Sequence, residues 1–168
     1  MYLKYNIIST SDLSKRNMKK KILKEFIDYG CGFSVVLKNV PMKKFYGKWI
    51  PDIDYNALEK CVLLMLCHKP VKLTGNEIRF IRLYFEMTLQ EFAKRFGVQH
   101  PTVVKWENFK NNPTSMTLGT EKDIRLFIIG HLIGKRKIAD LYNELEQKPL
   151  KSTDSHYPIE VDMERIAV

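Results

Sequence analysis

The chain has 168 residues, of which 45% are hydrophobic and 28% are charged, and its formal net charge is +9. This length suits one ordinary domain or two small domains that share a core. The positive charge favours polyanionic partners, nucleic acid first and an anionic membrane surface second. No stretch reaches the roughly 18 consecutive apolar residues that span a bilayer, and the first residues lack the order of a secretory signal. We therefore expect a cytoplasmic protein with no membrane partner.

Residues 1–24 are expected to form a basic, flexible arm, because they show no sustained hydrophobic period. The arm could follow DNA phosphates or enter a minor groove, or it could be a solvated tail. Its basic run consists of Lys15, Arg16, Lys19, Lys20, Lys21 and Lys24.

Residues 25–70 are expected to form a small β-rich unit with one helix. Three β-like stretches, at 25–29, 33–40 and 43–50, predict a small antiparallel sheet, the last with a turn or bulge at Gly47. A sheet of this size needs a helix to lean on. That helix should begin after an Asp54 N-cap and end before Pro70. It is apolar almost all round, so it is either a buried central helix or a subunit interface.

Residues 71–147 read as helices throughout. Thr74 and Glu77 fit a capping box, as do Thr88 and Glu91, so each pair marks a helix start. The second of these helices should end at Gly97, a third should cover 100–108, and two more should follow. One of these starts near 120 or 121 and the other follows a break at 134–137. Residues 148–168 are expected to be a flexible tail, although the alternation over 159–163 could add a strand to a sheet edge.

The three cysteines, Cys31, Cys61 and Cys67, indicate free thiols, because their number is odd and no Cys-x-x-Cys pair occurs. Cys61 and Cys67 are six residues apart on a predicted helix, which places them on different faces. Although His68 is adjacent, a zinc site needs four convergent ligands. We expect no metal and no cofactor.

Two helices joined by a tight turn are the feature that carries function. Ala93 is small where the second helix must cross closely, and Gly97 can adopt the positive φ that the turn needs. Val98 and Val103 would fill the space between the helices. The second helix could then lie in the major groove of DNA with its first turn nearest the base edges.

The segment MTLQEFAKRFGVQHPTVVKWEN resembles the helix-turn-helix of the lambda-repressor-like (XRE) regulators, written L-S-Q-x-E-L-A-x-x-L-G-V-S-x-x-T-V-S-R-W-E. The positions that match in type are Thr88, Glu91, Phe92, Ala93, Phe96, Gly97, Val98, Thr102, Val103, Trp106 and Glu107. The preceding KLTGNEIRFIRLYF looks like the segment before this motif in MqsA/YgiT-type antitoxins. Residues 26–70 resemble a version of their N-terminal zinc-binding domain in which the zinc cysteines are absent.

The resemblance implies double-stranded DNA as partner. Gln99 would be the N-cap of the recognition helix, the backbone N–H of Asn108 and the side chain of Lys110 would contact phosphates, and Leu89 replaces a phosphate-gripping Gln. Pro101 departs from the family because it offers no donor, although it could touch a thymine methyl. The expected DNA-binding residues are Thr88, Gln90, Arg95, Gln99, His100, Pro101, Thr102, Lys105, Asn108 and Lys110.

Structural roles remain open for several of the other residues. Trp106 could be core, Arg79 and Arg82 could be solvated, and His68 and His131 could be satisfied structural histidines. The helix-turn-helix could also be a protein-docking module. No motif of an esterase, P-loop, zinc protease or dinucleotide-binding enzyme occurs, so we expect no enzymatic activity.

The expected fold is mainly α within the α+β class: a small N-terminal antiparallel sheet and one helix packed on a five-helix lambda-repressor-like domain. The expected function is a transcriptional repressor, in its most specific form an antitoxin-type autoregulator of its operon. The alternatives are a toxin-neutralising interaction module and a DNA-binding accessory factor of a mobile element. Because one such domain has a single recognition helix, a homodimer is expected, with helix 54–68 and helices 121–147 as candidate seams.

Overall fold

The computed structural model describes residues 21–148, 150 and 157–166, and within them the chain forms six α-helices, a 3₁₀ turn and one four-stranded sheet. The strands are β1 (Lys21–Asp28), β2 (Val35–Phe45), β3 (Lys48–Pro51) and β4 (Ile159–Asp162), and the 3₁₀ turn η1 is Met163–Arg165. The helices are α1 (Tyr55–Cys67), α2 (Gly75–Tyr84), α3 (Leu89–Arg95), α4 (His100–Glu107), α5 (Leu118–Leu132) and α6 (Arg136–Gln147). The mixture confirms the α+β class. No helix of the described residues is long and apolar enough to cross a membrane.

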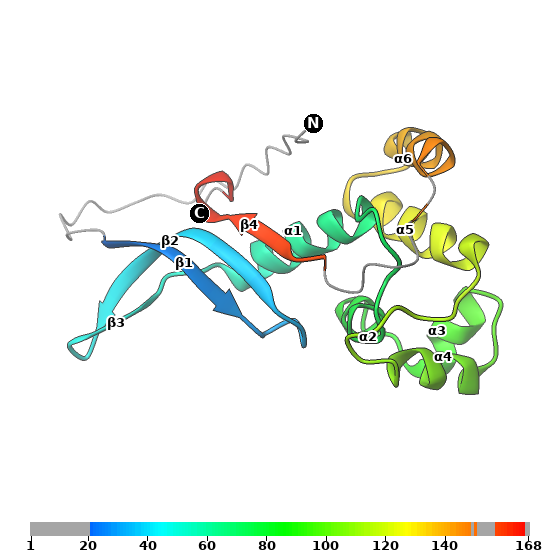
Figure 1. The fold of residues 1–168 in the computed structure, drawn as a ribbon, viewed down its shortest axis with the longest axis horizontal. Helices are drawn as coiled ribbons and strands as arrows, with labels where there is room; N and C mark the ends of the chain where they lie inside the picture. Colours follow the sequence, from blue (N-terminus) through cyan, green and yellow to red (C-terminus); the bar gives the residue numbers. More distant parts are fainter. Residues whose placement is uncertain (1–20, 149, 151–156, 167–168) are drawn as a thin grey trace.

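One hydrophobic core runs through the whole molecule. Figure 1 shows the sheet at one end, α2 to α5 at the other, and α1 reaching from the sheet to α5. Buried side chains of β2, α1, α2, α5 and β4 belong to the same cluster. The sheet-containing part and the helical part therefore share one core. A shared core was part of the two-unit arrangement that the chain length allowed.

The sheet is built around β2, the longest strand. It pairs antiparallel with β1 and β3 and parallel with β4, whose Ile159 lies beside Val35. The expectation of a purely antiparallel sheet was therefore wrong. Val35 and Leu37 are fully buried on β2, and Ile159 and Val161 alternate with exposed or half-exposed residues on β4. This period-two pattern turns one face of both strands towards α1.

Two expected boundaries in this region were wrong. β1 begins at Lys21, so the last four residues of the expected arm are paired strand; residues 1–20 of the arm lie outside the described part. The expected strand 43–50 is two strands joined by a two-residue turn at Tyr46 and Gly47. Both turn residues have positive φ, 45° and 79°. Of the two alternatives expected at Gly47, the structure has the turn, because Tyr46 and Gly47 reverse the chain, whereas a bulge would only bend one strand.

The expected flexible tail is in part a strand. Residues 159–162 form β4, as the alternation over 159–163 allowed, and Asp162 accepts a hydrogen bond from the Asn39 side chain at 3.1 Å. Residues 149, 151–156 and 167–168 lie outside the described residues. The C-terminal segment is therefore part of the sheet, because its Ile159 and Val161 gain burial by pairing with β2.

Helix α1 is a buried central helix. Asp54 caps it as predicted, accepting hydrogen bonds from the backbone N–H groups of Asn56 and Ala57. The helix packs against α5 and β4. The side chains that it buries are Leu58, Val62, Leu63, Leu64, Leu66 and Cys67. Most of its apolar surface is buried inside one chain, which favours the buried-helix alternative over a dimer seam.

A fully buried arginine fixes the segment between α1 and α2. Arg125 of α5 donates hydrogen bonds to the backbone carbonyls of Cys67, Lys69 and Val71, at 2.6–3.1 Å, and to the carboxylate of Glu121 at 2.8 Å. The segment is non-helical, so its carbonyls need donors once they are buried. Arg125 supplies them, and it thereby attaches the start of the helical part to α5.

A second buried ion pair lies next to the first. The ammonium of Lys69 contacts both carboxylate oxygens of Glu77 at 2.7 and 2.9 Å, and both side chains are almost inaccessible. Glu77 also accepts from the backbone N–H of Thr74, which completes the predicted capping box of α2. One carboxylate thus serves both as a cap and as the partner of a buried cation.

The C-terminal helices differ slightly from expectation at their ends. Thr117 caps α5, whose first residue, Leu118, lies two to three residues before the expected start. The predicted break between α5 and α6 is present, with Gly134 at a φ of 108°. His68, at the end of α1, contacts Glu144 of α6 at 2.9 Å, and His131 contacts the carbonyl of Phe127 at 2.9 Å. Both histidines therefore have structural partners.

Candidate nucleic-acid interface

Helices α3 and α4 meet through small and apolar side chains. Ala93 and Val103 are buried between them, and Trp106 is buried beside them, which confirms a core role for the tryptophan. Gly97 has a φ of 65°, and the N–H of Val98 donates to the carbonyl of Ala93 at 2.9 Å. The chain thus turns tightly after α3, as the sequence predicted.

A capping box formed by Thr88 and Glu91 fixes the start of α3. The Thr88 hydroxyl accepts from the backbone N–H of Glu91, and the Glu91 carboxylate accepts from the N–H and the hydroxyl of Thr88. These bonds hold the pKa of Glu91 below its ordinary value, because they favour the ionised carboxylate. The Thr88 hydroxyl is therefore already engaged and is less available for DNA than expected.

Helix α2 holds α4 through an ion pair. The Arg82 guanidinium contacts Glu107 at 2.6 Å through Nε and at 3.2 Å through Nη2, and it donates to the carbonyl of Met87 at 2.9 Å. Arg82 is 8% exposed, so the reading of this residue as solvated was wrong. A single side chain joins α2, the turn before α3 and the end of α4.

The start of α2 also approaches the end of α4 very closely. A Cβ on Gly75 would lie 2.5 Å from the carbonyl oxygen of Trp106 and 2.6 Å from the nitrogen of Lys110. The N–H of Asn76 donates to the carbonyl of Lys110 at 2.8 Å. Only a residue without a side chain allows this backbone contact, which sets the position of α4 against α2.

Most of the predicted DNA-binding side chains are on the surface. Gln99 is the N-cap of α4 as predicted, and its side chain makes no capping hydrogen bond. Pro101 lies in the first turn of α4, where no N–H is needed. Thr102 is half-buried; the exposed members are Thr88, Gln90, Arg95, Gln99, His100, Pro101, Lys105, Asn108 and Lys110. The first turn of α4 and Lys105 therefore present an edge of one helix that is polar except at Pro101 and exposed except at the half-buried Thr102.

Arg95 is tied to α5. Its guanidinium lies 4.9 Å from the ring centre of Phe127 and 5.0 Å from that of Phe96, and it approaches Asp123 at 3.5 Å. The structure thus gives Arg95 a packing role across α3 and α5, while its side chain stays 42% exposed.

One expected phosphate donor is already used. The backbone N–H of Asn108 donates to the carbonyl of Val104 at 3.1 Å, so the expectation that this N–H is free for a phosphate was wrong. Helix α4 continues far enough to satisfy it internally. The side chain of Lys110 is exposed beyond the helix end, where a φ of 53° turns the chain back towards α2.

Two residues that sequence analysis did not select lie beside Lys110. Asn76 and Arg79 line a hollow of about 220 Å³ between α2, α3 and α4. Arg79 is exposed and has no ion pair within the described residues. The other lining residues are Leu89, Val104, Glu107, Asn108 and Lys110. Asn76 and Arg79 are three residues apart and so share one face of α2, opposite the buried Ile78 and Ile81. This spacing is the sequence signal that could have identified them.

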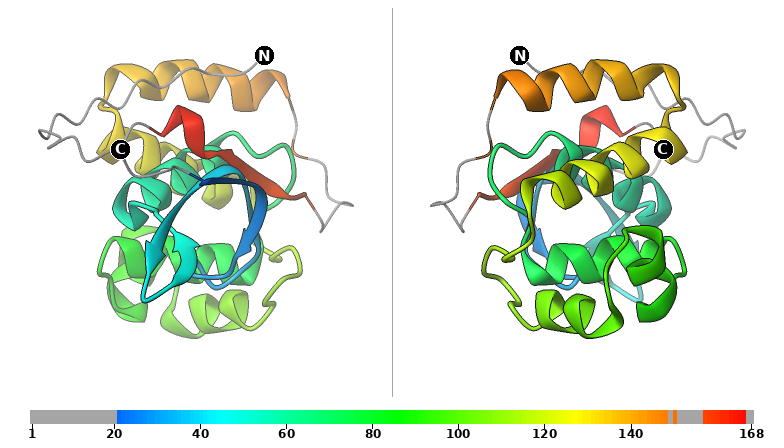
Figure 2. Two further views of the ribbon diagram at one scale, coloured as in Figure 1. Left: turned by 90° about the vertical axis from the view of Figure 1, so that its left-hand side faces the viewer. Right: turned by 90° about the vertical axis from the view of Figure 1, so that its right-hand side faces the viewer.

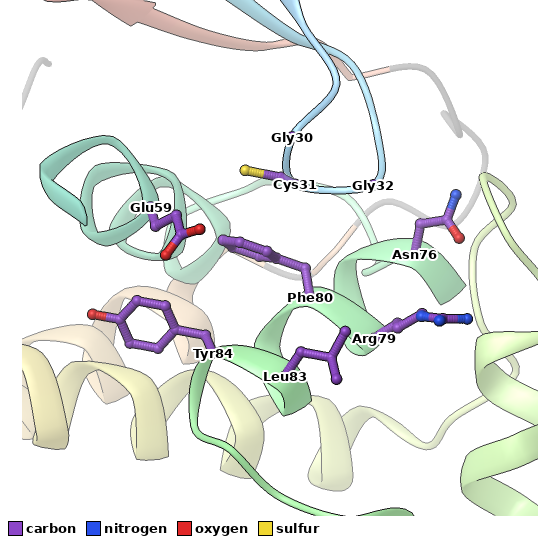
Figure 3. A pocket seen from close by; sticks show the side chains of 9 residues that line it. All are labelled: Gly30, Cys31, Gly32, Glu59, Asn76, Arg79, Phe80, Leu83 and Tyr84. Carbon is purple, nitrogen blue, oxygen red and sulfur yellow. The ribbon is translucent and has the colours of Figure 1, made fainter. Parts of the chain in front are cut away.

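A second hollow of about 320 Å³ lies between the sheet and α2. Figure 3 shows the loop with Gly30, Cys31 and Gly32 above Phe80 of α2, with Glu59 and Arg79 on opposite sides of the ring. Tyr84 lies below Glu59, and burial raises the pKa of its phenol, with Glu59 contributing. Arg79 therefore borders both hollows.

Burial raises the pKa of all three cysteine thiols. Burial raises the pKa of the Cys31 thiol to about 12, with the charges of Asp28 and Glu59 adding to the effect. Burial also raises the pKa of Cys67 to about 12 and that of Cys61 in the same direction. In the part of the chain that the structure describes, no three His, Cys, Asp or Glu side chains lie close enough to hold a metal ion.

No protein-family model, curated protein or solved structure matches this chain. The interpretation of α3 and α4 therefore depends on their own geometry and on the sequence of the motif.

Proposed function

We propose that the protein is a sequence-specific regulator, of the repressor type, that places α4 in the major groove of double-stranded DNA. The observation that carries the proposal is the edge of α4 on a helix that α2 holds from behind. Its exposed members are the N-cap Gln99 with His100, Pro101 and Lys105, and Thr102 is half-buried among them. A recognition helix must present polar side chains from its first turn and must not move relative to its support.

The chemistry of this edge suits base edges in the major groove. The Lys105 ammonium can donate to guanine O6 or N7, and the Gln99 amide can bond adenine N6 and N7. His100 can donate or accept. Pro101 lacks a donor and suits contact with a thymine methyl group.

Cations and one amide around this edge would supply the phosphate contacts. Lys110 and Arg79 lie at the far end of α4 and on α2, and Gln90 lies near the start of α3. Counterion release by such contacts makes binding salt-dependent.

We further propose that α2 to α6 make up a lambda-repressor-like unit and that two copies bind two half-sites about 34–36 Å apart. With α1 buried, the exposed side of α6, which includes Tyr142, is the remaining candidate for the dimer seam.

The test is a selection of bound sequences from random duplex DNA at two salt concentrations, followed by affinity measurements on the selected site. We expect His100→Ala and Lys105→Ala to weaken binding by about 1–3 kcal/mol each and to relax base preference. Lys60→Ala removes one positive charge from the exposed side of α1, which Figures 1 and 2 show above α3 and α4, and should change little. Unchanged affinity in the two α4 variants would contradict the proposal.

A further inference from the structure

The turn between β2 and β3 carries an exposed cluster of aromatic and basic side chains. Tyr46 is 91% exposed, Phe45 56% and Trp49 38%. We call this cluster the β2–β3 tip; its members are Lys43, Lys44, Phe45, Tyr46, Lys48 and Trp49. Figure 1 shows β3 and the turn before it at the end of the molecule opposite α3 and α4. The tip therefore takes no part in the α4 edge.

Tyr46 occupies a position that its side chain disfavours. It is the first of two turn residues with positive φ, at 45°, and Gly47 follows at 79°. Such turns prefer Asn, Asp or Gly at the first position, because these residues tolerate the left-handed region best. A tyrosine there weakens the turn, and its ring stays 91% exposed although its edge-to-face contact with Phe45 brings the ring centres within 4.5 Å. Strain of this kind, at a fully exposed aromatic residue, points to a role in binding.

The charges of the tip are all positive. Residues 41–51 contain Lys43, Lys44 and Lys48 and no acidic residue. Lys43 contacts Asp52 at 2.7 Å, whereas Lys44 and Lys48 have no ion pair within the described residues. Lys44 lies opposite Trp49 in the sheet register, and the ammonium of Lys21 lies 5.6 Å from the Trp49 ring centre. The Lys21 ammonium thus lies over the Trp49 ring, and a stacked base would take its place while the ammonium moves to the neighbouring phosphate.

We propose that the β2–β3 tip binds single-stranded DNA, with bases stacked on Tyr46 and Trp49 and with phosphates paired to the lysines. Exposed aromatic rings interleaved with lysines are the surface that unpaired nucleotides need. In an intact duplex the bases are already stacked, so these rings would have no partner. Protein interfaces are enriched in Tyr and Trp but depleted in Lys, which argues against a protein partner.

The tip also favours DNA over RNA. Recognition of RNA uses hydrogen bonds to the 2′-hydroxyl. Apart from the Tyr46 hydroxyl, the side chains of residues 41–51 offer no oxygen or nitrogen acceptor. The lysines and Trp49 can donate to the oxygen of a 2′-hydroxyl, but the surface has almost no acceptor for the proton of that hydroxyl, so it satisfies only half of what the group offers. The proposal does not depend on the function proposed for α4, since the two surfaces lie at opposite ends of the molecule.

The test measures binding of the full chain to a fluorescent oligothymidine of about 12 nucleotides. We expect Tyr46→Ala and Trp49→Ala each to weaken binding by at least about fivefold, and Lys44→Ala with Lys48→Ala to lower its salt dependence. Tyr29→Ala, which removes another exposed ring of the sheet region, should leave the affinity unchanged.

A second variant separates binding from folding. Tyr46→Asn places a favoured residue at the turn, so it should keep or raise the unfolding temperature while weakening binding as Tyr46→Ala does. The double variant His100→Ala with Lys105→Ala should retain oligothymidine binding. A failure of the α4 proposal can therefore be distinguished from a failure of the proposal for the β2–β3 tip. Unchanged affinity for oligothymidine in the Tyr46 and Trp49 variants overturns the proposal. So does duplex DNA that binds as tightly as oligothymidine and loses affinity in Tyr46→Ala, and so does RNA that binds about tenfold more tightly than DNA.

Discussion

Arg82 and Glu107 form a two-pronged ion pair that joins α2 to the last residue of α4, with Nε–Oε1 at 2.6 Å and Nη2–Oε2 at 3.2 Å. The third side of the guanidinium reaches the carbonyl of Met87 just before α3. A planar group with donors on several edges is what allows one residue to fix two helices and a turn.

Glu107→Gln should strongly destabilise the protein. The substitution leaves the Arg82 charge about nine-tenths buried with half of its partner's acceptors gone, and breaking such a pair costs about 3 kcal/mol. Urea unfolding measures the loss. Asp140→Asn, which breaks the exposed Lys137–Asp140 pair, is the control and should cost less than about 0.5 kcal/mol. Equal losses of unfolding free energy in the two variants would show that the buried Arg82–Glu107 pair stabilises the protein no more than an exposed pair does.

Gly75→Ala should destabilise the protein, whereas Gly119→Ala should not. The new Cβ at position 75 would meet backbone atoms of Trp106 and Lys110 at 2.5–2.6 Å, and the helices must separate to admit it. Such overpacking costs about 1–3 kcal/mol. At Gly119, in the first turn of α5, no atom lies within 4 Å of the added Cβ, and alanine is the better helix former by up to about 1 kcal/mol. Thermal unfolding of both variants tests the contrast, and the same sign of shift in both would refute it.

The α3 capping box should lose its contribution to stability in acid. Hydrogen bonds from Thr88 lower the pKa of Glu91 in the folded state. A lowered pKa means that the stabilisation is fully present above the unfolded value, 4.5, and is lost as the pH falls through the lower folded value. The difference in unfolding temperature between the wild type and Glu91→Gln should therefore be constant near neutral pH and should shrink below about pH 4. A difference that grows on acidification would contradict this assignment.

The native thiols should react slowly with iodoacetamide at pH 8. Thiolate is the reactive form, and burial raises the pKa of Cys31 and of Cys67 to about 12, so thiolate forms there only as the pH approaches that value. Cys61 is half-buried and should be alkylated first. Mass spectrometry after timed quenching gives the order, with urea-unfolded protein as the control in which all three thiols react. Rapid labelling of Cys67 in the native protein would speak against the packing of α1 on α5.

Features set by neighbouring residues were predictable from the sequence. The Asp54 cap, the two capping boxes and the Gly97 turn each need residues within four positions of one another, and the structure has all of them. The burial of Trp106 followed from its place in the motif. Local chemistry decides such features before tertiary packing does.

Features set by distant partners were not predictable in this way. Arg82 looked solvated because its partner, Glu107, is 25 residues away, and the start of β1 depends on pairing with Met42. Arg125 sits on an apolar helix with no sequence signal for the three carbonyls that it satisfies. Among the site residues, most side chains are exposed, as contact with DNA would require, whereas the engagement of Arg95 by Phe127 needs the tertiary structure.

The pairing of β4 with β2 has a consequence for how the protein is made. Residues 159–162 complete a sheet whose central strand begins at Val35, so more than 120 residues must be synthesised between the two partners. A ribosome releases α1 to α6 before it releases β4. In that interval the edge of β2 over residues 35–38 has free backbone donors and acceptors, and a nascent chain on the same messenger could pair there instead. Crowded synthesis should therefore favour strand exchange between copies, whereas dilute refolding should not.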